Sequence, residues 1–207
     1  MQTNKWWLPL LGLAFAAALA VCFALGGHPP EAANNSAASI VRFYTDNEKN
    51  LQISFFVGAF AAVLFVYFWS YIRSRLERAA GETGFLTRVL WAGVILFVAG
   101  AAIDTTLQVA MLEAAGQVPP AAIQTLQAFW DNDFVPMAVG IELIASSVAL
   151  STLLHGGLPK WLGWLMAIIA VLGLTPWGFF ALIGTGVWIL LASIALTIDE
   201  RKVAPTA

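Results

Sequence analysis

Residues 85–112 read FLTRVLWAGVILFVAGAAIDTTLQVAML, a long apolar run that contains only two charged side chains, Arg88 and Asp104. An α-helix of this length rises about 42 Å, which is more than the ~30 Å hydrocarbon core of a bilayer. The run therefore predicts a membrane-spanning helix, and Asp104 is the residue that least fits it.

The composition of the whole chain agrees with this interpretation. Of the 207 residues, 60% are hydrophobic and only 11% are charged, whereas soluble domains carry roughly 25% charged residues. The net charge of −2 and the lack of a basic patch argue against a nucleic-acid partner. A single cysteine, Cys22, excludes an intramolecular disulfide and a cysteine metal cage.

Further apolar stretches predict five more membrane helices. The last stretch, Trp161–Leu196, is too long for one span at ~54 Å. It is expected to turn at Gly173–Pro176, because glycine closes a helix and proline cannot continue one. The fold class is therefore all-α: a single integral membrane domain over residues 1–207, with spans at about 6–25, 53–72, 85–112, 134–154, 161–173 and 177–197.

The distribution of Lys and Arg predicts the orientation. With the N-terminus inside, eight basic residues lie on the inner side and only Arg42 and Lys49 on the outer side. The inner set is Lys5, Arg73, Arg75, Arg78, Arg88, Lys160, Arg201 and Lys202. This asymmetry predicts that both termini lie in the cytoplasm.

Two outer loops have helical periodicity. Residues 36–45 carry an apolar stripe with Ser36 as N-cap, and the segment that begins at Pro119 has an apolar side. Gln124 and Gln127 are expected on its wet side. We expect two short interfacial helices on the outer face, either simple connectors or a lid. Capping-box spacing over Thr45–Glu48 predicts the start of the second membrane helix there.

Asp104 and Glu142 are the two acids deep inside predicted spans. Counted from Leu112 and from Asp133, both lie roughly 12–14 Å below the outer surface. Intramembrane acids cost about 2.5–3.5 kcal/mol on insertion scales and indicate a functional site by default. No Lys or Arg occurs at this depth, so at least one carboxyl is expected to be protonated at neutral pH.

Small residues accompany both acids and predict a close helix–helix contact. Gly93 and Gly100 share a face with Asp104, and Ala138 and Ala145 share one with Glu142. The expected hydrogen-bond partners of the acids, and further candidates for the ligand or proton site, are Gln108, Thr105 and Ser146.

Three functions remain open for the acids. They are interhelical hydrogen-bond glue in a structural or partner-binding subunit, a site for a small cation, protonatable solute or proton relay, or the acid and base of an intramembrane enzyme. The enzyme is the least supported, because the sequence has no metal-ligand cluster, no phosphate loop and no catalytic serine–histidine set. Ser151 and His155 are four residues apart but lack a third member. We therefore expect no catalytic residues, no metal and no cofactor.

The expected partners are the lipid bilayer and a second copy of the chain or another membrane protein. An autonomous transporter of six helices is expected to need a dimer.

Three short motifs are similar to a known group. They are Phe43–Asn47, Tyr71–Leu76 and Leu158–Trp164, the last being the most specific. Over roughly residues 36–197 the chain resembles the small six-helix integral membrane proteins of actinobacteria that are classed as a domain of unknown function. The resemblance implies a bacterial plasma membrane and six helices. It implies no activity, and its motifs do not include Asp104 or Glu142.

Overall fold

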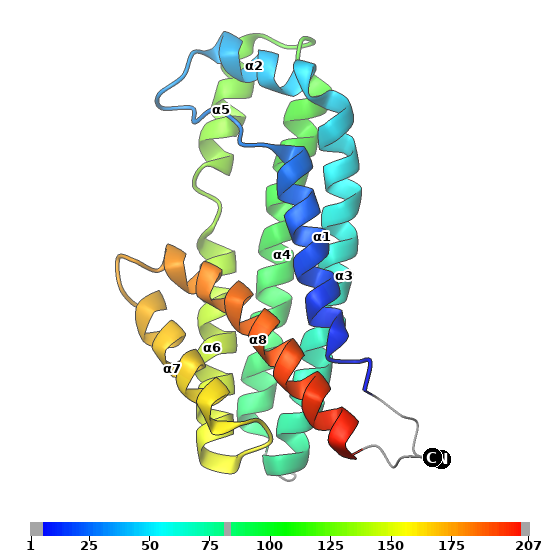
Figure 1. Ribbon diagram of the computed structural model, residues 1–207. Coiled ribbons are helices and arrows are strands. Elements are labelled where there is room, and N and C mark those ends of the chain that lie inside the picture. The colour runs from blue at the N-terminus through cyan, green and yellow to red at the C-terminus, as the bar shows by residue number, and fades with distance from the viewer. Residues whose placement is uncertain (1–5, 81–83, 204–207) are drawn as a thin grey trace.

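The computed structural model of the chain describes residues 6–80 and 84–203, and in these ranges every regular element is an α-helix (Figure 1). The all-α prediction is therefore confirmed for the described residues. The helices are α1 (Leu10–Gly26), α2 (Ala37–Asp46), α3 (Glu48–Ala80), α4 (Phe85–Ala114), α5 (Pro120–Trp130), α6 (Val135–His155), α7 (Lys160–Gly173) and α8 (Phe179–Val203).

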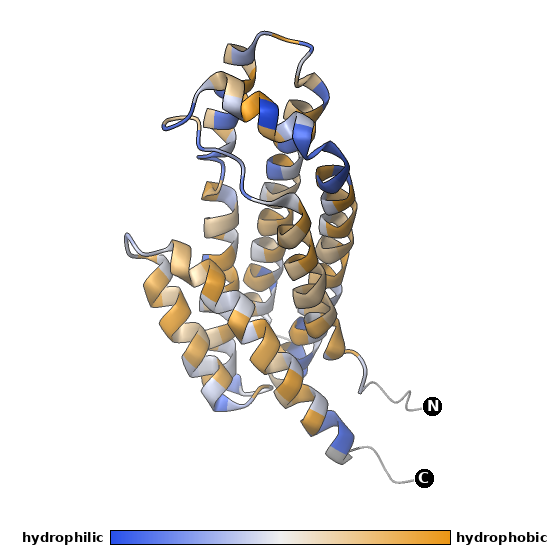
Figure 2. Cartoon of the chain, turned by 45° about the horizontal axis from the view of Figure 1, so that its top comes forward, coloured by the Kyte–Doolittle hydropathy of each residue, from blue (hydrophilic) through white to orange (hydrophobic). Residues whose placement is uncertain are grey.

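Long apolar helices dominate the described part of the chain. Four stretches are long and apolar enough to cross a membrane, namely Glu48–Ala80, Phe85–Ala114, Pro120–His155 and Phe179–Arg201. Hydrophobic residues cover most of the helix shafts, while hydrophilic residues gather at the two ends of the bundle (Figure 2). These features fit a multi-pass membrane protein. The predicted count of six spans depends on α1 and α7, which are shorter, with 17 and 14 residues.

The predicted helices of the two loops are present as α2 and α5. They lie together at one end of the bundle, where Ile40 and Tyr44 of α2 pack with Ile123 of α5 in a small buried cluster. Ser36 caps α2 as predicted, since its side chain accepts a hydrogen bond from Ser39 N. We call α2 and α5 the roof.

The predicted capping box at Thr45 is wrong. Thr45 belongs to α2, and its hydroxyl donates to the carbonyl of Arg42 one turn earlier in the same helix. The chain leaves α2 through Asn47 alone, and α3 begins at Glu48. The apolar stripe of α2 packs on the rest of the roof, so the helix continues to Asp46.

Helices α4 and α6 form a close seam, and Gly93 and Gly100 of α4 lie in it as predicted, but on α6 they meet Gly140 and Met137 instead of the predicted face of Ala138 and Ala145. A Cβ added to Gly93 would lie 2.7 Å from the carbonyl oxygen of Gly140, and one added to Gly100 would lie 2.8 Å from Met137 Cγ. The backbones therefore approach too closely for larger side chains at these glycines. The same contacts fix the vertical register of the two helices.

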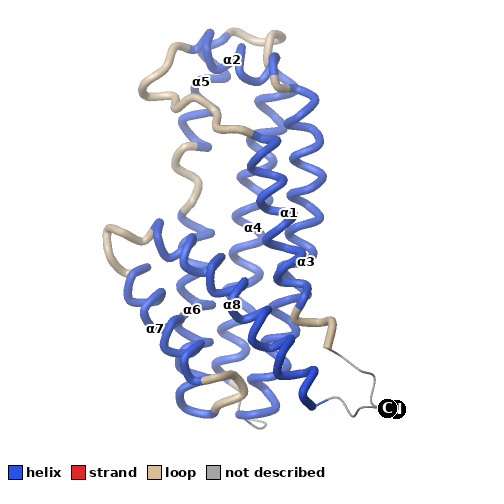
Figure 3. The backbone as a smooth tube through the Cα atoms, in the orientation of Figure 1, coloured by secondary structure: helices blue, strands red, loops and turns tan. Residues whose placement is uncertain are grey.

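The α7–α8 hairpin turns at residues 174–178, directly after Gly173, as predicted. Figures 1 and 3 show that this turn lies near the middle of the bundle height and below α5. Leu174 and Trp177 are exposed, at 78% and 65%. The backbone N–H groups of Thr175, Trp177 and Gly178 bond to neighbouring oxygens within residues 172–175. A turn with local hydrogen bonds and apolar side chains suits a low-dielectric environment.

Stacked indoles hold the α8 side of the core. The rings of Trp69 and Trp188 lie 5.5 Å apart and are tilted by only 3°. The Trp188 indole Nε1 donates to the carbonyl of Leu162 at 2.9 Å. These contacts join α3, α8 and α7, so the hairpin packs on the bundle through its inward face.

Candidate functional site

Asp104 and Glu142 lie at different heights in the bundle. Glu142 is beside the level of Gly93, because Gly93 contacts Gly140 and Ile144 of α6. Asp104 follows Gly93 by three turns, which gives an axial separation of about 16 Å. The expectation of equal depth therefore does not match the structure. The two depths differ because α4 continues to Ala114, past the level at which α6 begins. The chain above the start of α6 belongs to α5.

Asp104 lies under the roof instead. Gln108 Nε2, one turn away on α4, donates to Asp104 Oδ2 at 2.9 Å. The Trp130 indole N–H lies near the same carboxylate but does not reach hydrogen-bonding geometry, so Nε1 stays without a partner. Among the described residues, the hydrogen bond of Asp104 is thus within its own helix. This arrangement does not support interhelical glue.

A second carboxyl, Asp133, completes this group. Asp133 lies in the turn between α5 and α6, close enough to Asp104 for the two to interact electrostatically. Its Oδ2 is buried and has no hydrogen-bond partner. Among the described residues, no Lys or Arg forms an ion pair with either carboxyl. We call Asp104, Asp133, Gln108 and Trp130 the outer acid group.

A hydrogen-bonded chain runs through the roof beside this group. Tyr44 Oη donates to Gln127 Oε1 at 3.0 Å, and Gln127 Nε2 donates to Asp131 Oδ1 at 2.9 Å. The backbone N–H of Ala32 donates to Asp131 Oδ2 at 2.8 Å. Burial, reinforced by the charges of Asp131 and Asp104, raises the pKa of Tyr44, so its phenol stays neutral and donates.

The position of Gln127 corrects a prediction. We expected it on the wet side of its helix, but its side chain is fully buried at 0% exposure. The reason is that α2 covers this face and offers Tyr44 as a partner. Gln124, the other expected wet residue, bonds to the carbonyls of Ala32 and Asn35.

Thr105 and Ser146 do not reach the acid side chains. The Thr105 hydroxyl donates to Ala101 O at 2.9 Å, and the Ser146 hydroxyl donates to Glu142 O, a backbone atom, at 2.7 Å. Both bonds satisfy the hydroxyl within its own helix, which is the usual fate of such groups in apolar helices.

Glu142 lies at the end of the α7–α8 hairpin. Its Oε2 rests against Gly173, the last residue of α7, and is buried without a hydrogen-bond partner. The carboxyl is therefore placed beside a turn that is apolar and exposed. Asp104 and Glu142 occupy two separate environments.

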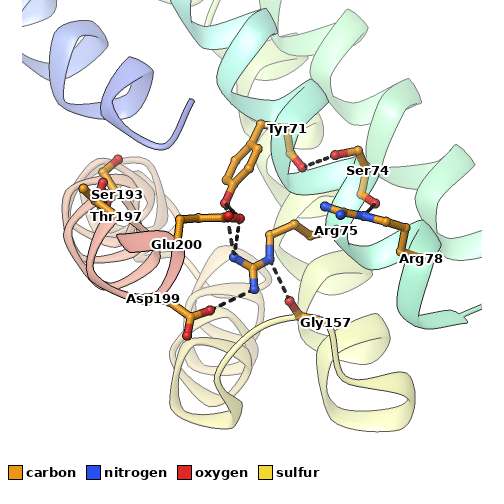
Figure 4. A network of polar contacts seen from close by, with 9 residues as sticks. All are labelled: Tyr71, Ser74, Arg75, Arg78, Gly157, Ser193, Thr197, Asp199 and Glu200. Atoms are coloured by element: carbon orange, nitrogen blue, oxygen red, sulfur yellow. Dashed lines mark hydrogen bonds and ion pairs between the residues drawn. The ribbon is translucent and has the colours of Figure 1, made fainter. Parts of the chain in front are cut away.

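A polar network that was not predicted from the sequence lies at the end of the bundle opposite the roof. Figure 4 shows Arg75 of α3 at its centre, with Nη2 3.0 Å from Asp199 Oδ2 and Nη1 3.2 Å from Glu200 Oε1. Tyr71 Oη donates to Glu200 Oε1 at 3.0 Å, and Arg75 Nε donates to Gly157 O at 3.2 Å. Three segments distant in sequence therefore meet at one guanidinium.

Metal chemistry finds no support in the described residues. Across 6–80 and 84–203, no group of three His, Cys, Asp or Glu side chains is arranged to hold a metal ion. The outer acid group offers two carboxyls that no described Lys or Arg pairs, an arrangement that can hold a proton or a monovalent cation.

Comparisons with known proteins give no further guidance. No family model, no curated protein and no solved structure matches this chain. Arguments about its function therefore rest on its own residues.

Proposed function

We propose that the chain is a six-span protein of the bacterial plasma membrane that binds a small cation, or relays a proton, at the outer acid group. The count of six rests on the apolar character of α1 and α7 beside the four long stretches. The orientation, with both termini in the cytoplasm, rests on the excess of Lys and Arg at one side. The actinobacterial resemblance agrees with this topology.

The observation that carries the proposal is the pair of carboxyls with no cationic partner. Asp104 and Asp133 interact electrostatically, and Asp133 Oδ2 is buried and unbonded. Two neighbouring carboxyls with low solvation do not both ionise unless a positive charge joins them. A bound proton or a small cation supplies that charge. The Trp130 indole turns its N–H edge toward Asp104, so it supplies a nearby hydrogen-bond donor and not a ring face for a cation.

The roof holds a hydrogen-bonded chain beside this site. Tyr44 interacts electrostatically with Asp104 and begins the hydrogen-bonded chain through Gln127 to Asp131. This chain has no hydrogen bond to Asp104, and the Gln127 amide in its middle does not relay protons. The same chain orders the roof over the carboxyls, which is the role of a lid.

The structural alternative has less support. Interhelical glue requires the acids to bond across helices, but Asp104 bonds to Gln108 on its own helix and Glu142 Oε2 bonds to nothing described. The intramembrane-enzyme alternative has Asp104 and Asp133 as acid and base, but among the described residues no metal-ligand cluster accompanies them. Neither alternative is favoured by a specific contact.

Cation titration of the purified protein tests the proposal. Isothermal titration calorimetry in neutral nanodiscs with methylammonium, Na⁺ and K⁺ in turn, at fixed ionic strength, is expected to show saturable binding of at least one. Asp104→Asn removes the charge at constant size and should abolish this binding. Glu113→Gln is the matched control, because Glu113 is an exposed acid near the end of the same helix.

Proton release on cation binding provides a second test of the proposal. Cation binding to a protonated carboxyl pair displaces a proton, which a pH dye in weak buffer reports. We expect release in wild type and Glu113→Gln but not in Asp104→Asn. If no cation binds, and the acid–base titration of wild type and Asp104→Asn is the same between pH 5 and 9, the outer acid group is not a site.

A further inference from the structure

One polar group of the roof points at the outer acid group. Trp130 is the last residue of α5, and its indole turns the N–H edge toward the carboxyl of Asp104. Within the described part of the chain, Trp130 Nε1 is buried and has no hydrogen-bond partner. An indole N–H can only donate a hydrogen bond. Trp130 is therefore a buried donor that faces a carboxyl group without bonding to it.

The charge of Asp104 decides how strongly this donor is attracted. A buried donor without a partner destabilises the fold, and a hydrogen bond to a charged acceptor is roughly twice as strong as one to a neutral acceptor. An ionised Asp104 carboxylate therefore attracts the indole N–H far more than a protonated carboxyl does. The position of Trp130 is expected to follow the charge of Asp104.

Trp130 is also tied to the rest of the roof. Its ring packs against the small buried cluster between α2 and α5. One turn earlier on α5, Gln127 bonds to Tyr44 of α2 and to Asp131. A displacement of the indole is therefore transmitted through α5 to α2. The hydrogen-bonded chain of the roof has no bond to Asp104, so Trp130 is the polar link between the two.

Hydrogen-bond donors to Asp104 are few. Gln108 Nε2 donates to its Oδ2 from the same helix. Tyr44 Oη is occupied, because it donates to Gln127. Among the described residues, no Lys or Arg forms an ion pair with Asp104. The Trp130 indole is therefore the neighbouring donor that an ionised Asp104 can still recruit.

The charged groups of the neighbouring elements do not compete with the indole. Asp133 of the α5–α6 turn and Tyr44 of α2 interact with Asp104 electrostatically, and neither is a cation. At the roof end of α3, Glu48 and Lys49 are exposed. On α6, Glu142 lies in its separate environment against the end of α7.

We propose that Trp130 is a positioning residue through which the outer acid group regulates the roof. When Asp104 is ionised, the indole N–H donates to its carboxylate and holds α5 over the site. When a proton neutralises the carboxyl, or a cation occupies its oxygens, this bond is lost and α5 is released. The structure, with Trp130 Nε1 unbonded, has the geometry of the released state. This inference rests on the function proposed above and adds its regulation.

The indole N–H signals in nuclear magnetic resonance spectra provide the test. The full chain, isotope-labelled and in neutral nanodiscs, is titrated between pH 5 and 9, and the Trp130 signal is assigned by its loss in Trp130→Phe. We expect this signal to move downfield as the pH rises, because a hydrogen bond to a carboxylate deshields the proton. The movement should vanish in Asp104→Asn.

Trp69 is the matched reference in the same spectra. Its Nε1 is also buried without a partner, but its ring is held by stacking on Trp188. The Trp69 signal, assigned by its loss in Trp69→Phe, should stay in place over the whole titration. A movement of both signals together would indicate a general change of the fold and would contradict a specific role of Trp130.

Hydrogen exchange of the α5 backbone reports whether the roof is released. At high pH the α5 amides of Trp130→Phe should exchange at least about tenfold faster than those of wild type, the effect of one lost hydrogen bond to a charged group. At low pH the two proteins should exchange alike. Phe129→Leu is the control on the same helix, because Phe129 is 66% exposed, and it should match wild type throughout.

The outcomes separate this inference from the function on which it rests. A Trp130 signal that does not move in wild type, or that still moves in Asp104→Asn, would overturn the role of Trp130. If the acid–base titrations of wild type and Asp104→Asn nevertheless differ, the outer acid group remains a site and only its regulation fails. If those titrations also agree, both fail. Should Trp130→Phe not fold, Trp130→Tyr supplies the assignment, and the comparison with Asp104→Asn decides.

Discussion

The carboxyl of Glu142 lies directly against the Cα of Gly173, where α7 ends. A Cβ at position 173 would clash with Glu142 Oε2, so a glycine is required there as long as the carboxyl keeps its place. The contact ties an acid of α6 to the start of the α7–α8 turn. It also sets the height of that turn at the level of Glu142.

Gly173→Ala is therefore expected to destabilise the protein by no more than about 1 kcal/mol, because the only close atom, Glu142 Oε2, ends a flexible side chain that can rotate away. The measurement is the thermal midpoint in detergent. Gly186→Ala is the control, because a Cβ at Gly186 meets nothing within 4 Å. That control should be neutral or slightly stabilising, since alanine is the better helix former.

A second substitution tests whether the Glu142 carboxyl causes the effect of Gly173→Ala. In a Glu142→Ala background the clash is gone, so Gly173→Ala should then cost little. If Gly173→Ala is equally harmful with and without the Glu142 carboxyl, the two residues are not coupled in the way the structure indicates.

The α4–α6 seam gives a second prediction. A Cβ at Gly140 would lie 2.7 Å from the backbone nitrogen of Phe97, an atom that cannot rotate away. Gly140→Ala should therefore separate the helices and lower the stability by about 2–3 kcal/mol. Thermal denaturation beside Gly186→Ala checks this. Wild-type stability in Gly140→Ala would show that the seam is looser than described.

The helix positions follow from the sequence because each apolar run must satisfy its backbone within one helix. The turn after Gly173 was predictable for the same reason, as the run before Leu196 exceeds one membrane thickness. Local signals also placed α2, with Ser36 as its cap. The prediction at Thr45 was wrong because capping-box spacing can also occur at a residue that still belongs to the preceding helix.

The site was harder to predict because it depends on register between distant helices. The pairing of Asp104 with Asp133 requires the vertical offset of α4 and α6, which the Gly93–Gly140 contact sets and no local pattern encodes. The burial of Gln127 depends on the docking of α2. Arg75 was assigned to the inner side by its charge alone, and its partners come from distant segments.

Arg75 provides a third prediction. Its side chain is only 18% exposed and bonds to Asp199, Glu200, Tyr71 and Gly157. Arg75→Ala should lower the stability by about 1–3 kcal/mol, because it leaves partly buried acceptors without a donor. Arg78→Ala should have little effect, since Arg78 is exposed and its hydrogen bond within the described residues is to Ser74 O of its own helix.

Arg75→Lys distinguishes the network from a simple charge effect. Lysine keeps the charge but lacks the planar fork that reaches several acceptors at once, so it should recover only part of the loss. Thermal denaturation of the three variants at low and high salt is the measurement. Full recovery by lysine, together with loss of the effect at high salt, would indicate an ordinary surface ion pair.

The buried phenol of Tyr44 gives the last prediction. Tyr44→Phe removes the donor to Gln127 Oε1 and leaves a fully buried acceptor unsatisfied, which should cost about 1–3 kcal/mol. Tyr67→Phe is the control, because Tyr67 is 62% exposed. Adding Gln127→Leu should restore part of the stability lost in Tyr44→Phe, since the unsatisfied acceptor is then removed as well.

The stability of the roof should also depend on pH through Tyr44. Burial raises its pKa above the ordinary value of 10.0, so the unfolded chain loses this proton at lower pH than the folded one. The contribution is fully present below pH 10.0 and declines as the pH rises further. Wild type should therefore lose stability between about pH 9.5 and 11 more steeply than Tyr44→Phe. Chemical denaturation across that range measures the free energy of unfolding of both proteins. If it falls with pH equally in wild type and Tyr44→Phe, the phenol is not buried under the roof.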